Sequence, residues 1–201
     1  MSKGLVTTVD LIRHGEPVGG RRYRGQIDDP LSDLGWEQMR GAMPEVLPWQ
    51  KVISSPLIRC AAFARELAAN HDGMSVVEDE RLKEIGFGVW EGMTRDQLRA
   101  DDPYILERFF NDPVANRPEG AEHLADFQSR IQQALDDAIN TNAGANLLIV
   151  AHAGVIRAAM CYVLSAPIEH MFRIKVTNAS ITRLQFKQGS PPTLLFHEGQ
   201  V

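Results

Sequence analysis

Long hydrophobic runs, cysteine pairs and a surplus of positive charge are all missing from this 201-residue sequence. No apolar run approaches the ~20 residues of a transmembrane helix, so we expect no membrane-spanning segment. Residues 1–5 leave too little chain before the first apolar segment for a signal peptide, so we expect a cytoplasmic location. The net charge of −5 does not favour a surface that binds nucleic acid.

The two cysteines, Cys60 and Cys161, lie far apart within helical patterns, which favours reduced, buried thiols over a disulfide framework or a zinc site. Hydrophobic residues at 44% and charged residues at 23% are close to ordinary globular usage and exclude disordered and collagen-like classes. A chain of this length can fill one core, so we expect a single domain over residues 1–201.

Two apolar segments end in a histidine that is followed closely by glycine. Residues 6–12 read as a strand that runs into Arg13 and His14, and residues 147–150 read as a fully buried parallel strand that runs into His152. Open α/β sheets bind their ligands at the carboxyl ends of strands. We therefore expect both histidines to meet at one pocket, in a mostly parallel sheet with helices on both faces, a three-layer αβα sandwich.

A third segment supplies a cation beside a helix start. Ser55 and Pro56 precede a helical pattern over residues 57–68, and a serine cap followed by proline predicts that the helix begins there. Arg59 then lies in the first helical turn, where free N–H groups already favour an anion and a guanidinium adds a bidentate donor for phosphate.

Two loops complete the set of candidate residues. The glycine-rich residues 81–92 carry Glu84, which could act as an acid, with Glu80 and Glu91 as nearby competitors; Glu91 is expected to bond backbone instead. Residues 81–122 are expected to cap the site. The polar residues 19–30 carry further cations and glycines.

These residue types suit phosphoryl transfer to histidine. A neutral imidazole nitrogen is a nucleophile, and arginines neutralise the oxygens of a transferring phosphoryl group. A leaving alkoxide needs a proton, which a nearby carboxylic acid can supply before it activates water in the second half-reaction.

In order and spacing, residues 11–16, 54–59, 84–92 and 150–157 resemble the motifs of the histidine phosphatase superfamily, in the branch of cofactor-dependent phosphoglycerate mutases and small phosphatases. The resemblance implies that His14 becomes phosphorylated, that Arg13, Arg59 and His152 hold the phosphate, and that Glu84 is the proton donor. It implies neither a metal nor a cofactor. Further contacts with a small-molecule phosphate ester are expected at Arg22, Arg24, Gly25 and Ala153, although the two arginines could be a solvated face and Gly25 could simply make a turn.

Residues 21–39 look most like the bacterial α-ribazole 5'-phosphate phosphatases, which act late in cobalamin assembly. Two departures from the superfamily bear on the substrate: Gly20 stands where many members have asparagine, and residues 120–122 read Gly-Ala-Glu where members often read Gly-Glu-Ser. The longer insertion with an adjacent arginine pair that the mutases carry is missing, so mutase activity is not expected.

Three alternatives remain open from the residues alone. The enzyme could be a phosphatase of broad or different specificity, or a phosphate-binding protein without turnover. A third possibility makes His14, His152 and Glu84 metal ligands, but the sequence lacks a tight paired-ligand spacing and Arg13 would repel a cation. An oligomer is possible.

Overall fold

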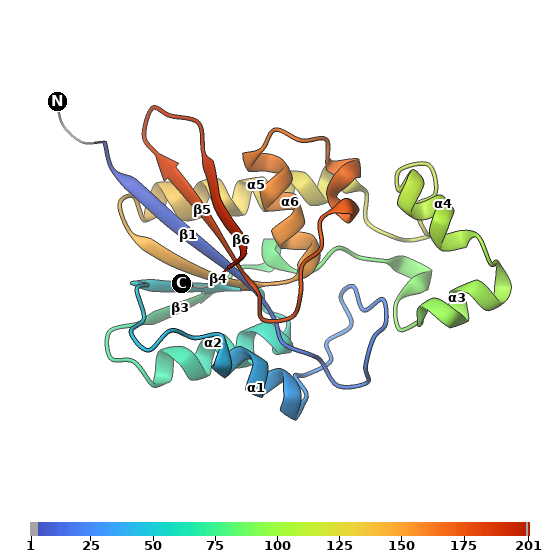
Figure 1. The fold of residues 1–201 in the computed structure, drawn as a ribbon, viewed down its shortest axis with the longest axis horizontal. Helices are drawn as coiled ribbons and strands as arrows, with labels where there is room; N and C mark the ends of the chain where they lie inside the picture. Colours follow the sequence, from blue (N-terminus) through green and yellow to red (C-terminus); the bar gives the residue numbers. More distant parts are fainter. Residues whose placement is uncertain (1–3, 200) are drawn as a thin grey trace.

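Six strands form one mixed sheet in the computed structural model, which describes residues 4–199 and 201 (Figure 1). The strand order is β3-β2-β4-β1-β5-β6. Neighbours among β3, β2, β4 and β1 are parallel, whereas β5 is antiparallel to β1 and β6 is antiparallel to β5. The bounds are Val6–Arg13 for β1, Lys51–Ser54 for β2, Ser75–Glu78 for β3, Asn146–Ala151 for β4, Ile181–Lys187 for β5 and Thr193–Gly199 for β6.

Helices cover both faces of the sheet, as expected for a three-layer sandwich. Helices α1 (Asp33–Gly41) and α2 (Ile58–Ala69) lie on one face, and α5 (Leu124–Thr141) and α6 (Ala153–Val163) lie on the other (Figure 1). The predicted fold class is therefore confirmed. No helix in residues 4–199 has the length and apolar character needed to cross a membrane.

Alternating strand residues supply the two halves of the core. Leu11 and Ile149 pack with α5 and α6, whereas Ile12 and Val150 pack against the α1 and α2 side. All four side chains are at most 1% exposed. Because β1 and β4 are buried on both faces, their carboxyl ends are held in fixed register, with Arg13 opposite Ala151.

The two helices on the first face begin differently. Ser32 caps α1, since its hydroxyl accepts a hydrogen bond from the Gly35 N–H at 3.0 Å. The predicted start of α2 at Ser55 is wrong: the helix begins at Ile58 after Leu57, and Pro56 lies before it. Ser55 does not cap this helix, because its hydroxyl oxygen accepts from the Leu57 N–H, ahead of the helix, and contacts His152, as described below.

Residues 81–122 leave the main sheet, and the part from Trp90 onward forms a small cluster of its own. The segment begins inside the 3₁₀ turn Glu80–Leu82 and includes the 3₁₀ turn Gly88–Trp90 and helices α3 (Arg95–Asp101) and α4 (Ile105–Asn111). Trp90, Leu98, Leu106 and Phe109 pack together as a separate apolar cluster. Figure 1 shows α3 and α4 beyond the end of the sheet at which β1 and β4 terminate. A further 3₁₀ helix, Ile168–Arg173, packs against this cluster through Phe172.

Candidate active site

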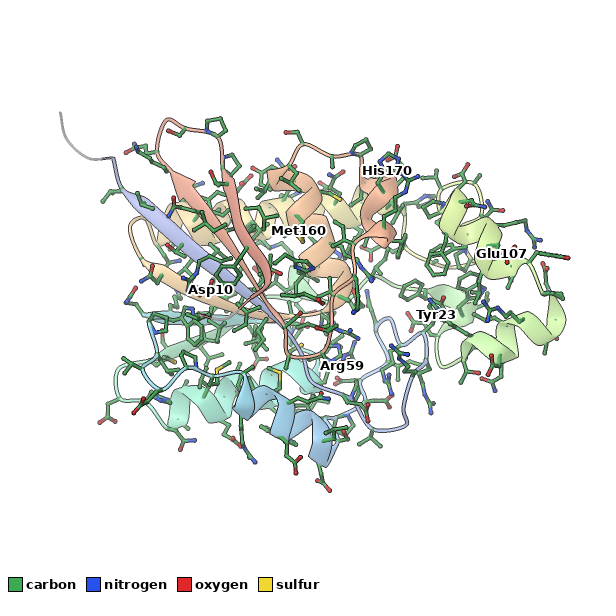
Figure 2. The ribbon with its side chains drawn as sticks, viewed as in Figure 1. Asp10, Tyr23, Arg59, Glu107, Met160 and His170 are labelled. Atoms are coloured by element: carbon green, nitrogen blue, oxygen red, sulfur yellow. The ribbon has the colours of Figure 1, made fainter. Side chains whose placement is uncertain are left out.

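A cavity of about 430 Å³ opens where β1 and β4 end. Tyr23, labelled in Figure 2, lies between the end of the sheet and helices α3 and α4. Eight of the nine predicted site residues line this cavity. They are Arg13, His14, Arg22, Arg24, Gly25, Arg59, Glu84 and Ala153.

His14 is held as a neutral imidazole with one nitrogen available. Its Nδ1 lies 2.7 Å from the Gly15 carbonyl, and since a carbonyl only accepts, Nδ1 carries the proton and Nε2 keeps its lone pair. Burial, followed by the charges of Arg59 and Arg13, lowers the pKa of His14 well below its usual value. The ring is therefore neutral at neutral pH, with a free lone pair on Nε2, the form of imidazole that can act as a nucleophile.

Glycine at position 15 is required by a close backbone crossing. A Cβ atom there would lie 2.1 Å from the Gly35 carbonyl oxygen, and a Cβ on Gly35 would lie 2.1 Å from the Glu16 carbonyl oxygen. The turn that carries His14 is thus pressed against the start of α1. A side chain at either glycine would push these two backbone segments apart.

Arg13 and Arg59 line the cavity beside His14 and come from two different elements. Arg13 donates to the Val176 carbonyl at 2.6 Å, and its Nε is buried with no hydrogen-bond partner in the described residues. Burial lowers the pKa of Arg13 to about 10, which leaves it cationic at neutral pH. Arg59 is 1% exposed, and its guanidinium donates to the carbonyls of Ile27 and Gly25 at 2.7 and 2.9 Å.

His152 lies behind His14 rather than on the cavity wall. The two rings meet edge to face with centroids 5.1 Å apart, and His152 is fully buried. Its Nε2 lies 2.7 Å from the Ser55 hydroxyl oxygen. Burial, with Arg59 the next contribution, lowers the pKa of His152 well below its usual value. Contact between His152 and phosphate stays a prediction, and Ser55 is a neighbour that the sequence did not single out.

Glu84 is the one carboxylate of the three candidates that lines the cavity. Its Oε1 accepts from the Ile85 N–H at 3.0 Å, and its Oε2 accepts from the Gly154 N–H at 3.1 Å, at the start of α6. Glu80 instead pairs with Lys83 at 2.6 Å. These contacts orient one carboxyl group toward the space beside His14.

Glu91 bonds backbone, as expected. Its Oε1 accepts from the N–H groups of Phe87 at 2.9 Å and Gln26 at 3.1 Å. Glu91 thus joins the loop of residues 81–92 to that of residues 19–30, which carries three arginines and is called the basic loop below. Gly25 has a φ of +53°, and a Cβ there would lie 1.9 Å from Glu91 Oε1. Glycine therefore allows the loop to turn against the carboxylate.

The basic loop is folded by its own arginines. Arg22 donates to the Gly19 carbonyl at 2.6 Å, and Arg24 donates to the carbonyls of Val18 and Gly20 and pairs with Asp29 at 2.9 Å. Both side chains reach the cavity wall while serving the loop. Their contact with substrate stays a prediction.

Several cavity residues were not predicted. Asn178 donates to the His14 carbonyl at 3.1 Å, and Arg157 donates to the Ile174 carbonyl at 2.8 Å. Arg157 follows Ala153 by four residues on one helix face, a spacing that could have identified it. The remaining unpredicted lining residues include two cations and four aromatic side chains, together with residues next to predicted ones: Glu16, Pro17, Gly20, Arg21, Tyr23, Ile85, Phe87, Arg95, Phe110, Gly154 and Phe172.

The fold and the cavity together define an α/β protein with a histidine-centred, arginine-lined anion site at the carboxyl ends of parallel strands. The family model described as the histidine phosphatase superfamily (branch 1) matches residues 9–198. The chain belongs to this superfamily.

Similar proteins cover most of the chain. The bifunctional protein Rv2228c of Mycobacterium tuberculosis is 32% identical over 191 residues, which are 92% of this chain and 52% of that protein. The chain thus spans about half the length of this curated relative. Among solved structures, Bacillus stearothermophilus YhfR is 30% identical with a TM-score of 0.84, covering 97% of this chain and 98% of that one.

Two further structures carry names of phosphatases. The mycobacterial glucosyl-3-phosphoglycerate phosphatase Rv2419c is 28% identical, with a TM-score of 0.77 and 90% of each chain covered. The alpha-ribazole phosphatase from Shigella flexneri is 26% identical, with a TM-score of 0.79 and 96% of each chain covered.

Proposed function

We propose that this protein is a metal-independent phosphomonoesterase that works through a phosphohistidine at His14. The observation that carries the proposal is the His14–Gly15 hydrogen bond, which leaves Nε2 unprotonated in a cavity lined by arginines. Membership of the histidine phosphatase superfamily supports the same chemistry.

The proposed reaction has two steps. In the first, His14 Nε2 attacks phosphorus, an N–P bond forms, and the ester P–O bond breaks while the Glu84 carboxylic acid gives its proton to the leaving oxygen. In the second, Glu84 takes a proton from water, the water oxygen attacks phosphorus, and the N–P bond breaks. Arg13 and Arg59 neutralise the phosphoryl oxygens in both steps.

For the substrate, we propose α-ribazole 5'-phosphate as the first candidate, which would place the protein in cobalamin assembly. The support is the resemblance over residues 21–39, the likeness to the Shigella phosphatase, and the cavity wall. Rings that can stack on a flat base line that wall, namely Tyr23, Phe87, Phe110 and Phe172. A cytoplasmic location, with no nucleic-acid or membrane partner, remains a prediction of the sequence.

A second candidate substrate is a phosphate ester that carries another anionic group. Seven arginines line the cavity, and within the described residues Arg24 is the one paired with a carboxylate. Arg13 and Arg59 beside His14 suit one phosphate, whereas Arg95 and Arg157 line the same cavity without a carboxylate partner. This surplus of unpaired cations favours an acidic leaving group.

Rapid mixing with a phosphorus-labelled ester tests the chemistry. Wild-type protein should acquire an acid-labile, base-stable label that is missing from His14→Ala. Hydrolysis should continue in excess EDTA; its loss, with recovery on adding a metal, would favour the metal-ligand alternative. An unlabelled wild-type protein that binds phosphate without turnover would reveal a binding protein.

Specificity constants distinguish the substrates. The informative pair is 3-phosphoglycerate against glycerol 3-phosphate, because the two differ by a carboxylate. A preference for α-ribazole 5'-phosphate over both supports the first candidate. A strong preference for 3-phosphoglycerate that disappears in Arg95→Gln supports the second, and equal constants across the panel indicate broad specificity.

A further inference from the structure

Glu84 lies on a stretch of chain that has no helix or strand of its own. It falls between the 3₁₀ turns Glu80–Leu82 and Gly88–Trp90, so residues 83–87 lack the regular hydrogen bonds of an element. A general acid must come within hydrogen-bond reach of the oxygen that it protonates. Other residues must therefore fix the backbone that carries this carboxyl group.

Arg130, in the middle of α5, donates hydrogen bonds to the backbone carbonyls around Glu84. Its Nη1 donates to the carbonyls of Arg81 and Lys83, the latter at 2.7 Å, and its Nη2 donates to the Glu84 carbonyl at 3.1 Å. Its Nε and Nη2 donate to the two carboxylate oxygens of Glu122 at 2.7 and 2.9 Å. All five guanidinium N–H groups thus have an acceptor.

Glu122 closes the contact from the other side of the loop. Its Oε2 accepts from the Gly86 N–H at 3.2 Å, and its own N–H donates to the Gly86 carbonyl at 2.9 Å. The side chains of Arg130 and Glu122 are 19% and 20% exposed, and their two-point contact fixes orientation as well as distance. The chain is therefore held both at Glu84 and two residues beyond it.

Helix α5 is a rigid base for this arrangement. Phe127 and Ile131, on either side of Arg130 in sequence, are at most 1% exposed in the core, and the guanidinium also lies 4.7 Å from the Phe127 ring centroid. Arg130 is not among the residues that line the cavity. Arg130 therefore does not contact a substrate in this cavity, and its hydrogen bonds on this side of α5 go to the loop that carries Glu84 and to Glu122.

We propose that Arg130, together with Glu122, is a positioning residue that sets where the Glu84 carboxyl group stands relative to the leaving oxygen. The inference rests on the proposed function, because it takes Glu84 as the acid. The Glu84 carboxylate accepts hydrogen bonds from the Ile85 and Gly154 N–H groups, and the Glu84 backbone carbonyl accepts one from Arg130. The peptide is thereby clamped between α5 and the start of α6.

Two esters with different leaving groups distinguish a positioning role of Arg130 from a general loss of folded protein. An alkoxide such as that from glycerol 3-phosphate needs a proton as it leaves, whereas nitrophenolate from p-nitrophenyl phosphate does not. The ratio of kcat/KM for the two esters, measured on one sample, is independent of the fraction of protein that is folded. It also reports the phosphorylation step, in which Glu84 donates its proton.

Arg130→Gln should lower kcat/KM for glycerol 3-phosphate at least about tenfold more than for p-nitrophenyl phosphate, a part of the ~10²–10⁴-fold contribution of a general acid. Glu122→Gln should act in the same direction, and Arg130→Lys should restore part of the loss because it keeps the charge. The matched control is Arg65→Gln on α2, which breaks the exposed pair between Arg65 and Glu78 of β3 and should leave the ratio unchanged.

Equal losses on the two esters in both Arg130→Gln and Glu122→Gln would overturn the positioning role. The same ratio measured for Glu84→Gln gives the effect of losing the acid itself. It distinguishes a failure of the positioning role from a failure of the assignment of Glu84 as the acid. If Glu84→Gln shows the leaving-group dependence and Arg130→Gln does not, only the positioning role is rejected. If Glu84→Gln itself lacks the dependence, the assignment of the acid in the proposed function is rejected as well.

Discussion

The imidazole rings of His14 and His152 meet edge to face, 5.1 Å apart, at the ends of two adjacent parallel strands. Burial keeps both rings neutral, since it is the largest cause of their lowered pKa values. A protein that buries two neutral histidines takes up fewer protons than its unfolded chain under mildly acidic conditions.

The first prediction concerns stability against pH. Unfolded histidines titrate near pH ~6.5, so the free energy of unfolding should be independent of these two groups above that pH. It should fall as the pH drops below it, by up to about 1.4 kcal/mol per pH unit for each ring, until the folded pKa is reached. Urea unfolding between pH 5 and 8 measures this slope. His14→Asn should make the slope shallower, and an unaltered slope would contradict the prediction.

Removal of the acid should slow chemistry without weakening binding. Glu84→Gln keeps the size and shape of the side chain, but its single amide oxygen can accept from only one of the Ile85 and Gly154 N–H groups, and it cannot supply a proton. Turnover of alkyl phosphates should drop ~10²–10⁴-fold, with the affinity for inorganic phosphate retained. Single-turnover kinetics and phosphate titration measure the two quantities. Normal turnover would show that another group supplies the proton.

Arg59 should couple anion binding to the basic loop. Arg59→Lys keeps the charge but cannot reproduce the two contacts with the Gly25 and Ile27 carbonyls. We expect phosphate affinity to fall about tenfold, near the ~1.4 kcal/mol associated with one charge-assisted hydrogen bond. Phosphate titration of the folded variant checks this. Wild-type affinity in Arg59→Lys would mean that the guanidinium serves only the loop.

A stability prediction falls on the middle of β1. Asp10 is 1% exposed and accepts from Trp49 Nε1 at 2.7 Å and from Arg183 at 2.8 Å through both carboxylate oxygens. Asp10→Ala leaves the guanidinium and indole donors without their acceptor and should cost about 3–5 kcal/mol. Denaturant unfolding monitored by tryptophan fluorescence measures the loss. The exposed pair broken in Arg65→Gln is the control, and an equally small effect at Asp10 would contradict the prediction.

The sequence predicted correctly those cavity residues whose position depends only on the helix or strand that carries them. Arg13 and His14 end a buried strand, and Arg59 stays in the first turn of α2 even though that helix begins later than expected. The wrong helix start has a physical cause, because Ser55 contacts His152, which lies 97 residues away in the chain. No local pattern encodes such a contact.

Residues placed by long-range folding were missed for the same reason. Asn178 reaches His14 because β5 returns beside β1, and Arg95 reaches the cavity because α3 lies beyond the end of the sheet at which β1 and β4 terminate. A single sequence gives their residue types but not the turns that bring them back. The order of the strands had to be known first.

The place of β1 in the sheet has a consequence for local opening of the molecule. With β4 on one side and β5 on the other, β1 is an interior strand, and the pattern continues past its end because the His14 N–H donates to the Ala151 carbonyl at 2.9 Å. Such amides exchange with solvent only when large parts of a domain open together. We therefore expect the His14 amide to exchange with the slowest-opening amides of the sheet, and the amides of residues 19–30, which belong to no helix or strand, to exchange faster.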